Sequence, residues 1–141
     1  MIKIVLPIPP TGQQRPRFTR IGRFHKAYKS NKQKAEESKI MLLLYQYRPK
    51  QPLNEALNVQ IDAFLPIPQS WPKWKKKAAL NGEIRPTKKP DIDNLAKQVL
   101  DCMNQVFWQD DRQIVGLMVR KFYAMDPRWE IHIKKITEEE L

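Results

Sequence analysis

The chain has 141 residues, a single cysteine and 41% hydrophobic residues. This length predicts one domain over residues 1–141 that buries roughly two-thirds of its unfolded surface. One cysteine excludes a disulfide framework and a cysteine-based zinc site, and it is typical of a reducing compartment. No apolar run approaches the ~18 residues of a membrane span, and the start lacks the layout of a signal peptide. We therefore expect a soluble cytoplasmic protein without membrane contact.

The formal net charge of +11 indicates a polyanionic partner. Residues 1–35 carry nine Lys and Arg and no acid, and residues 71–89 carry seven basic residues against one Glu. Residues 90–111 reverse the sign, with five Asp against one Lys. Acids weaken passive DNA binding, but they suit a protein that places a divalent cation between its carboxylates and a phosphate. The alternative is that these acids are scattered on a solvated face.

The first third of the chain predicts a strand, a basic connection and a helix. Residues 2–6 are apolar and end at prolines, which predicts a strand. Residues 11–29 predict a long loop or ribbon, which is uncommon unless it is functional. Ser30 and Gln33 form a potential capping box for a helix that runs to about Tyr47. Its apolar face is broad enough that part of it could cover a partner subunit.

The remainder predicts further strands and helices, which complete an α+β domain. We expect a mixed sheet of about four strands with two main helices and one short helix. The strand over 114–123 is apolar on both parities, which favours a central position, and its short link to the last strand predicts a hairpin. The expected segments are a strand over 56–65, a short helix capped at Ser70 and ending at Leu80, a helix over 92–106, strands over 114–123 and 128–136, and a solvated tail over 138–141.

Two aspartates stand at the start of the helix predicted over 92–106. Pro90 holds the preceding segment extended, so the side chains of Asp91 and Asp93 can point the same way. Asp93 can also serve as the N-cap of the helix. Lys97 follows one turn later on the same face. The chain then turns at Asp110 and Asp111, and a strand that leads back can bring Asp111 beside the first two aspartates.

Three converging carboxylates need a proton or a cation between them. At about 4 Å and an effective dielectric near 20, each like-charged pair costs on the order of 4 kcal/mol. A ligand set of oxygen atoms without His or Cys favours Mg²⁺, with Mn²⁺ as a substitute, over zinc. Such a cation can activate water for in-line attack on phosphorus, and Lys97 could neutralise the charge that develops on the phosphorane or the leaving oxygen.

Each part of this pattern also has a purely structural interpretation. Asp-x-Asp before a helix is often only an N-cap, and Asp110-Asp111 alone is most often a turn. Asp93, Lys97 and Asp101 could form a ladder of ion pairs worth roughly 0.2–0.5 kcal/mol each. The joint spacing and the basic surroundings favour the metal site.

Basic residues interleaved with aromatic residues fill the connection over 11–29. This pattern predicts a strip that binds the DNA backbone and unstacked bases, although a merely soluble loop would look similar. We also expect contacts to DNA from the basic pair before the aspartates. The predicted DNA-binding residues are Arg15, Arg17, Arg20, Arg23, Lys26, Lys88 and Lys89.

Three motifs together resemble the RusA family of Holliday-junction resolvases, and in particular its phage and prophage members. They are Gln14-Arg15-Pro16-Arg17-Phe18 with Gly22-Arg23, Lys89-Pro90-Asp91-Ile92-Asp93-Asn94-Leu95-x-Lys97 with Leu100-Asp101, and Phe107-Trp108-x-Asp110-Asp111-x-Gln113-Ile114.

The resemblance implies a RusA-like fold and a homodimeric, Mg²⁺-dependent crossover junction endodeoxyribonuclease. Such an enzyme nicks two opposing strands of four-way DNA junctions in recombination and repair. The family's metal-binding and catalytic aspartates match Asp91, Asp93 and Asp111, and its catalytic lysine matches Lys97. Asp110 matches the adjacent acid of the family's Asp-Asp pair.

Two other functions remain open at this point. A non-catalytic nucleic-acid-binding protein would use the aspartates only to cap a helix and form a turn. A nuclease for flaps or other branched DNA would use the same residues on another substrate. Removal of Mg²⁺ tests the first alternative, and a comparison of substrates tests the second.

Overall fold

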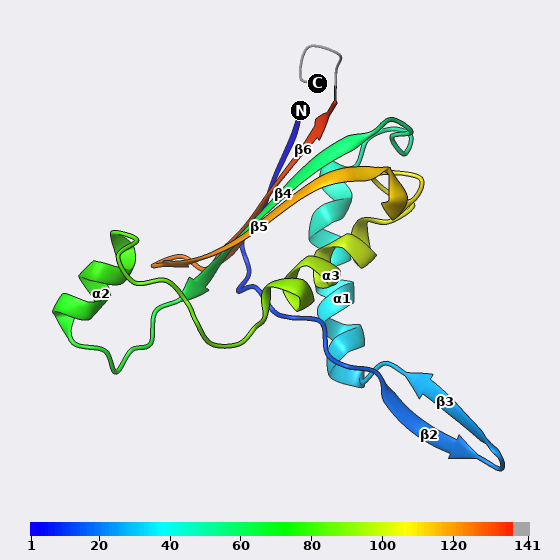
Figure 1. Ribbon diagram of the computed structural model, residues 1–141, viewed down its shortest axis with the longest axis horizontal. Helices are drawn as coiled ribbons and strands as arrows, with labels where there is room; N and C mark the ends of the chain where they lie inside the picture. Colours follow the sequence, from blue (N-terminus) through cyan, green and yellow to red (C-terminus); the bar gives the residue numbers. More distant parts are fainter. Residues whose placement is uncertain (137–141) are drawn as a thin grey trace.

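The computed structural model describes residues 1–136 and confirms the predicted α+β class (Figure 1). The strands are β1 (Ile2–Leu6), β2 (Arg17–Ile21), β3 (Phe24–Tyr28), β4 (Leu57–Pro66), β5 (Ile114–Ala124) and β6 (Arg128–Lys135). The helices are α1 (Asn31–Leu44), α2 (Lys73–Leu80) and α3 (Ile92–Met103), with 3₁₀ turns η1 (Tyr45–Tyr47) and η2 (Asp111–Gln113). The predicted tail over 138–141 lies outside the described residues.

The main sheet is mixed and has the strand order β1-β6-β4-β5. Central strand β4 pairs in parallel with β5, where Leu57 is opposite Ile114, and antiparallel with β6, where Ala63 is opposite Trp129. The predicted hairpin of the last two strands is therefore wrong, because β4 lies between them and the link over 125–127 crosses the end of β4.

Strand β5 lies at an edge of the sheet, so the prediction of a central strand there is also wrong. Its apolar residues on both parities have two different environments. Part of the strand packs against α3, whereas Val115, Leu117 and Met118 remain 61%, 47% and 54% exposed. In this chain, apolar residues on both faces of β5 therefore do not indicate that the strand lies between two other strands.

Helices α1 and α3 pack against each other and cover one face of the main sheet (Figure 1). Alternate residues of β4 point into this layer: Val59 and Ile61 are buried, whereas Asn58 and Gln60 face the opposite side. This alternation is the pattern expected for a sheet with one covered face. The largest fully buried side chains are Trp108, Trp129, Phe107, Ile4, Leu6, Ile40, Leu44, Leu57, Ile61, Leu95, Met103 and Ile131.

Helix α1 begins as the sequence predicts but is capped by only half of a capping box. The backbone N–H of Gln33 donates to Ser30 Oγ at 3.1 Å, which confirms the N-cap. The Gln33 side chain does not return to Ser30 but points across to α3. Leu42 and Tyr45 lie on an exposed side of the helix and its 3₁₀ extension.

Helix α3 presents its apolar stripe to the core, with Leu95 and Val99 fully buried. Its N-cap is Asp91, so the prediction of Asp93 as the N-cap is wrong by two residues. The helix ends at Met103 and not at Val106, because Gln105 adopts a left-handed φ of 67° that cannot continue a right-handed helix.

The basic connection forms a hairpin of β2 and β3, hereafter the arm, which confirms the predicted ribbon. Phe18 pairs with Ala27 and Ile21 with Phe24, and Gly22 supplies the positive φ of 60° that the tight turn needs. All ten strand residues are exposed. The arm projects away from the main sheet beyond the N-terminal end of α1 (Figure 1).

The short helix α2 confirms the predicted helix before Asn81 and Gly82. Its N-cap is Pro72, so Ser70 does not cap it as predicted. Among the described residues, no helix has both the length and the apolar character to cross a membrane.

Candidate active site

The first turn of α3 carries two exposed carboxylates. Asp91 is the N-cap, but its side chain accepts no capping hydrogen bond, and Asp93 lies in the first turn. In the part of the chain that the structure describes, neither carboxylate has a hydrogen-bond or ion-pair partner. The positive end of the helix dipole favours negative charge here. These free oxygen atoms are the donor type that a hard divalent cation prefers, so the residues present fit such an ion.

Lys97 follows on the exposed side of α3, one turn after Asp93. No ion pair joins Lys97 to Asp93 or Asp101 within residues 1–136, and Asp101 instead accepts a hydrogen bond from Gln13 Nε2 at 2.6 Å. The alternative of an ion-pair ladder along the helix is therefore not observed. The ammonium group remains available to a ligand at the start of α3.

A close backbone contact fixes the start of α3. The backbone N–H of Gln13 donates to the carbonyl of Asn94 at 2.9 Å. A Cβ atom at Gly12 would lie 2.9 Å from Pro90 Cβ and 3.2 Å from Asn94 Cβ, closer than packed carbon atoms normally approach. Glycine at position 12 thus allows the chain to pass directly over the residues that present Asp91 and Asp93.

Buried glutamines connect this region to the base of the arm. Gln98 of α3 is fully buried, accepts from Gln33 Nε2 at 2.6 Å and donates to Thr11 Oγ1 at 2.8 Å. Gln33 in turn accepts from the backbone N–H of Gln14 at 3.0 Å. Sequence reasoning missed this network. The available signal was a glutamine within each helix's apolar stripe, where a polar side chain requires partners.

The neighbouring residues Asp110 and Asp111 have different roles. Asp110 caps a turn, and the carboxylate of Asp111 is oriented by a tryptophan. Asp110 caps η2, since its carboxylate accepts from the Arg112 N–H at 2.9 Å and its own N–H donates to Gln113 Oε1 at 2.8 Å. The turn interpretation therefore fits Asp110. Asp111 Oδ1 accepts from Trp108 Nε1 at 2.7 Å, which leaves Asp111 Oδ2 without a partner in the described chain.

Trp108 both packs in the core and orients a carboxylate. Its ring is fully buried beneath the helices, while its indole N–H reaches the partly buried Asp111. Gln113 fixes the same turn by donating to the carbonyls of Leu53 and Glu55 at 2.9 and 3.0 Å. The Asp111 carboxylate is thus held in one orientation by groups that are themselves fixed.

The three aspartates do not gather within one chain. Asp91 and Asp93 lie at the N-terminal end of α3, whereas Asp111 comes after its C-terminal end, and the 12-residue helix between them is about 18 Å long. Residues 1–136 contain no group of three or more Asp, Glu, His or Cys side chains that could hold a metal ion. Within one chain β5 does not carry Asp111 back to the start of α3, because Asp111 precedes that strand.

The predicted DNA-binding residues occupy two exposed places. Arg15, Arg17, Arg20, Arg23 and Lys26 lie on or beside the arm, together with the exposed rings of Phe18 and Phe24. Arg20 Nε donates within the turn to the carbonyl of Gly22 at 2.9 Å. Lys88 and Lys89 lie just before Asp91, and the carbonyl of Lys88 accepts from Lys121 Nζ at 2.7 Å.

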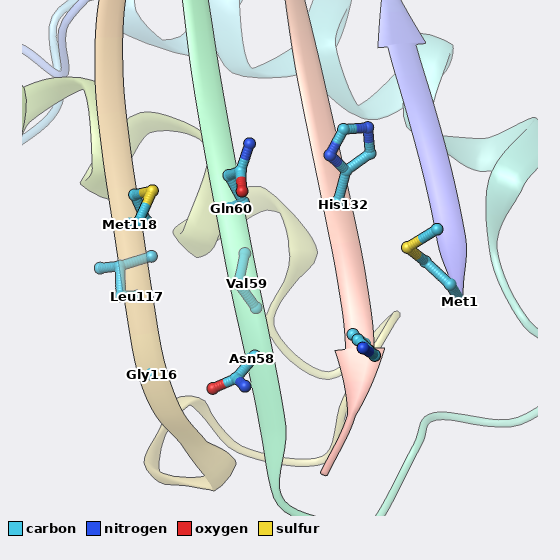
Figure 2. A pocket seen from close by; sticks show the side chains of 9 residues that line it. Met1, Asn58, Val59, Gln60, Gly116, Leu117, Met118 and His132 are labelled. Carbon is cyan, nitrogen blue, oxygen red and sulfur yellow. The ribbon is translucent and has the colours of Figure 1, made fainter. Parts of the chain in front are cut away.

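A shallow hollow on the sheet face opposite the helices is a separate feature (Figure 2). Figure 2 shows Asn58, Gln60 and His132 standing on neighbouring strands, with Met118 and Met1 at the sides. None of the described residues that line it is acidic. The hollow therefore does not coincide with the carboxylates of the candidate site.

Comparisons with known proteins agree with the motifs of the site. The model of the family Endodeoxyribonuclease RusA matches residues 7–134. An uncharacterized protein of Bacillus subtilis (strain 168), YqaN, is 36% identical over 131 residues, covering 91% of this chain and 92% of that protein. A crossover junction endodeoxyribonuclease of Lactococcus phage r1t is 33% identical over 86 residues, covering 59% of this chain and 57% of that protein. The chain therefore belongs to the RusA family of endodeoxyribonucleases.

Proposed function

We propose that this protein is a Mg²⁺-dependent, structure-selective endonuclease that resolves Holliday junctions by paired, symmetric nicks during DNA recombination or repair. The observation that carries the proposal is the pair of unpartnered carboxylates at the start of α3, next to Lys88, Lys89 and Lys97. Family membership and the phage relative's activity support the same reaction class. We further propose that residues 1–141 act as one domain and that the enzyme is a homodimer.

Asp91, Asp93 and Asp111 are the proposed ligands of the metal, with Mn²⁺ as a substitute for Mg²⁺. A divalent cation supplies an activated water and neutralises phosphate charge when bound. Lys97 places its ammonium group where negative charge develops on the phosphorane or on the leaving oxygen. The indole of Trp108 orients Asp111. Asp110 is a candidate for the same site, but its role as a cap already accounts for its position.

The arm and the basic segment before α3 supply the proposed DNA contacts. The exposed cations of the arm, Arg15, Arg17 and Arg23, can bind phosphates on two branches of a junction. The exposed rings of Phe18 and Phe24 can stack on unpaired bases. Phosphate contacts position a protein without reading sequence. Selection by junction shape is therefore expected to dominate over base preference.

The direct test incubates the protein with a synthetic four-way junction, a flap and a linear duplex, with Mg²⁺ or with EDTA. We expect paired nicks only in the four-way junction and only with Mg²⁺. Asp93→Asn should bind the junction without nicking it, while Asp101→Asn, on the same helix but two turns further on, should nick normally. Tighter binding in EDTA with no product under any condition would identify a non-catalytic DNA-binding protein, and preferential cleavage of the flap would identify another branched substrate.

A further inference from the structure

A small pocket lies between α2 and the end of β5. Its volume is about 240 Å³, below the roughly 300–1,000 Å³ of sites that hold whole small molecules. Its size therefore suits a single ring system. Two aromatic rings and three cations line it, and none of its described lining residues is acidic. These five residues are Trp71, Tyr123, Lys75, Arg85 and Lys88.

We propose that this pocket binds one unpaired nucleotide of the DNA junction, with the base against the aromatic rings and the phosphate on the cations. The inference rests on the proposed function, because it takes branched DNA as the ligand. It adds a binding site that is separate from the arm and from the three aspartates, and it gives α2 a role in holding the substrate.

The aromatic side of the pocket is held in place before a ligand binds. The rings of Trp71 and Tyr123 pack edge to face, with their centroids 5.2 Å apart. Arg85 fastens the segment after α2 to the strand. Its Nε donates to the carbonyl of Lys121 at 2.7 Å, and its guanidinium lies 4.0 Å from the ring centre of Phe122. Rings that are already fixed lower the entropic cost of binding a base.

The cations of the pocket lack acidic partners. Lys75 Nζ lies over the ring of Trp71, 4.1 Å from its centre. A cation over a partly exposed ring is held weakly, so an incoming base can take its place on the ring while the ammonium group moves to the phosphate. Within residues 1–136 no carboxylate pairs with Lys75, Arg85 or Lys88. Their charge is therefore available to an anionic ligand.

A second hollow connects the pocket to the start of α3. It shares Lys88 and Tyr123 with the pocket and continues along Lys89 to Pro90. Lys88 and Asp91 are three residues apart in the chain, so at most about 11 Å separates their Cα atoms. Successive nucleotides of one strand rise about 3.4 Å. A strand with a phosphate at Asp91 can therefore place a nucleotide about three steps away, or fewer, in the pocket.

A branched substrate supplies a base for such a pocket more readily than a linear duplex does. A base pair at the branch point can lose its stacking neighbour on one side, so releasing its base costs less than extruding a base from continuous duplex. The pocket has no room for a base pair. Its occupation would therefore favour binding of branched DNA over binding of linear duplex.

Photocrosslinking locates the base directly. Four-way junctions with iodouracil at one position at a time, within about three nucleotides of the nicked phosphate, are bound to the protein in EDTA and irradiated. Mass spectrometry then identifies the crosslinked peptide. We expect one position to crosslink to Trp71 or Tyr123. Crosslinks only to the arm or to Trp74, which is 69% exposed outside the pocket, would overturn the proposal, as would a bound junction without any crosslink.

A thermodynamic cycle combines a change in the protein with a change in the DNA. Stacking of a base on an aromatic ring is worth roughly 5- to 150-fold in affinity, so an abasic nucleotide at the crosslinked position should weaken wild-type binding by that factor. Trp71→Leu should lose a similar factor on the intact junction and nothing more on the abasic one. Trp74→Leu is the matched control and should show the wild-type loss. An abasic loss that persists in Trp71→Leu would mean that this ring only packs, which would overturn the proposal.

A milder variant leaves both aromatic rings intact. Lys75→Met keeps the apolar stem and removes the charge, so it should reduce the slope of log affinity against log salt by about 0.7, the value for one phosphate of a single strand. Lys77→Met, exposed on the same helix outside the pocket, should leave the slope unchanged. An unchanged slope in Lys75→Met, or equal changes in both variants, would contradict a phosphate bound at the pocket.

The nuclease activity and the pocket can fail separately. A protein that crosslinks through Trp71 or Tyr123 but nicks no junction would refute the proposed function and leave the pocket as a DNA-binding site. Normal nicking of the four-way junction without that crosslink would refute the pocket alone.

Discussion

The start of α3 and the arm differ in how their side chains are held. Gly12, Gln13, Gln98 and Trp108 fix the acidic groups through backbone contacts and buried hydrogen bonds. The arm is a two-stranded hairpin with every strand residue exposed. A hairpin without a packed face is marginally stable and adaptable. The proposed catalytic groups are therefore held in a fixed geometry, whereas the arm presents an adaptable surface to a branched substrate.

The largest effect on the fixed region is expected from Trp108→Phe. This change keeps most of the buried ring but removes the indole N–H that orients Asp111. Loss of a group that orients a metal ligand typically costs about 10–100-fold in activity or metal affinity, and we expect that loss in nicking rate with unchanged junction binding. Trp129→Phe is the control, since Trp129 is equally buried and its Nε1 has no partner in residues 1–136. Equal losses in both variants would contradict a positioning role.

A smaller effect is expected from Gly12→Ala. The new methyl group would press on Pro90 and Asn94 and displace the start of α3 by a few tenths of an ångström. Because a 1 Å displacement can cost about 100-fold, we expect roughly a tenfold lower nicking rate in single-turnover assays. Gly82→Ala is the control: it strains a residue with a φ of +80° whose added Cβ would have no neighbour within 4 Å among the described residues, so it should lower stability without lowering the rate. A normal rate in Gly12→Ala would argue against the contact.

The next prediction concerns the buried glutamines Gln33 and Gln98, whose hydrogen bonds connect α3 to the base of the arm. Gln98→Leu removes the 2.6 Å hydrogen bond that Gln33 Nε2 donates to Gln98 and keeps the longer one to Glu37 Oε1 at 3.3 Å, so it should lower the free energy of unfolding by about 1–3 kcal/mol, measured by denaturant titration. The double variant Gln33→Leu with Gln98→Leu removes both polar groups, so it should recover part of that loss. A double variant less stable than the sum of the single variants would contradict a direct bond between the two.

The smallest effect is expected in the arm. Arg17→Ala removes one exposed cation and should reduce the slope of log affinity against log salt by about 0.9 if Arg17 contacts one phosphate. The nicking rate at saturating junction should be unchanged, because the arm does not position the carboxylates. Arg48→Ala, a cation stacked on Tyr45 away from the arm, is the control. An unchanged slope in Arg17→Ala would mean that this residue lies away from the DNA.

Local patterns in the sequence predicted the local parts of this structure. Apolar spacing located α3 to within three residues at its end, and the alternation of residues 57–65 predicted the face of β4 that packs on the helices. The basic residues over 11–29 predicted a charged loop or ribbon, and the structure has a ribbon there. These features depend on residues close together in the chain, so short-range reasoning reaches them.

The errors concern relations between distant segments. The edge position of β5 and the insertion of β4 between β5 and β6 depend on strand pairing, which periodicity does not encode. Asp111 was expected beside Asp91 because a returning strand was assumed to carry it back, whereas the aspartate precedes that strand. The bond between Gln33 and Gln98 joins two helices 65 residues apart in the chain.

The central claim is that Asp91, Asp93 and Asp111 share one divalent cation, and a crystal of the protein grown with Mn²⁺ tests it most directly through the anomalous signal of the metal. We predict a peak at the start of α3 that is bound by Asp91 and Asp93, with Asp111 as a further ligand. A crystal saturated with Mn²⁺ that shows no peak at the start of α3, or a peak bound only by other residues, would contradict the account.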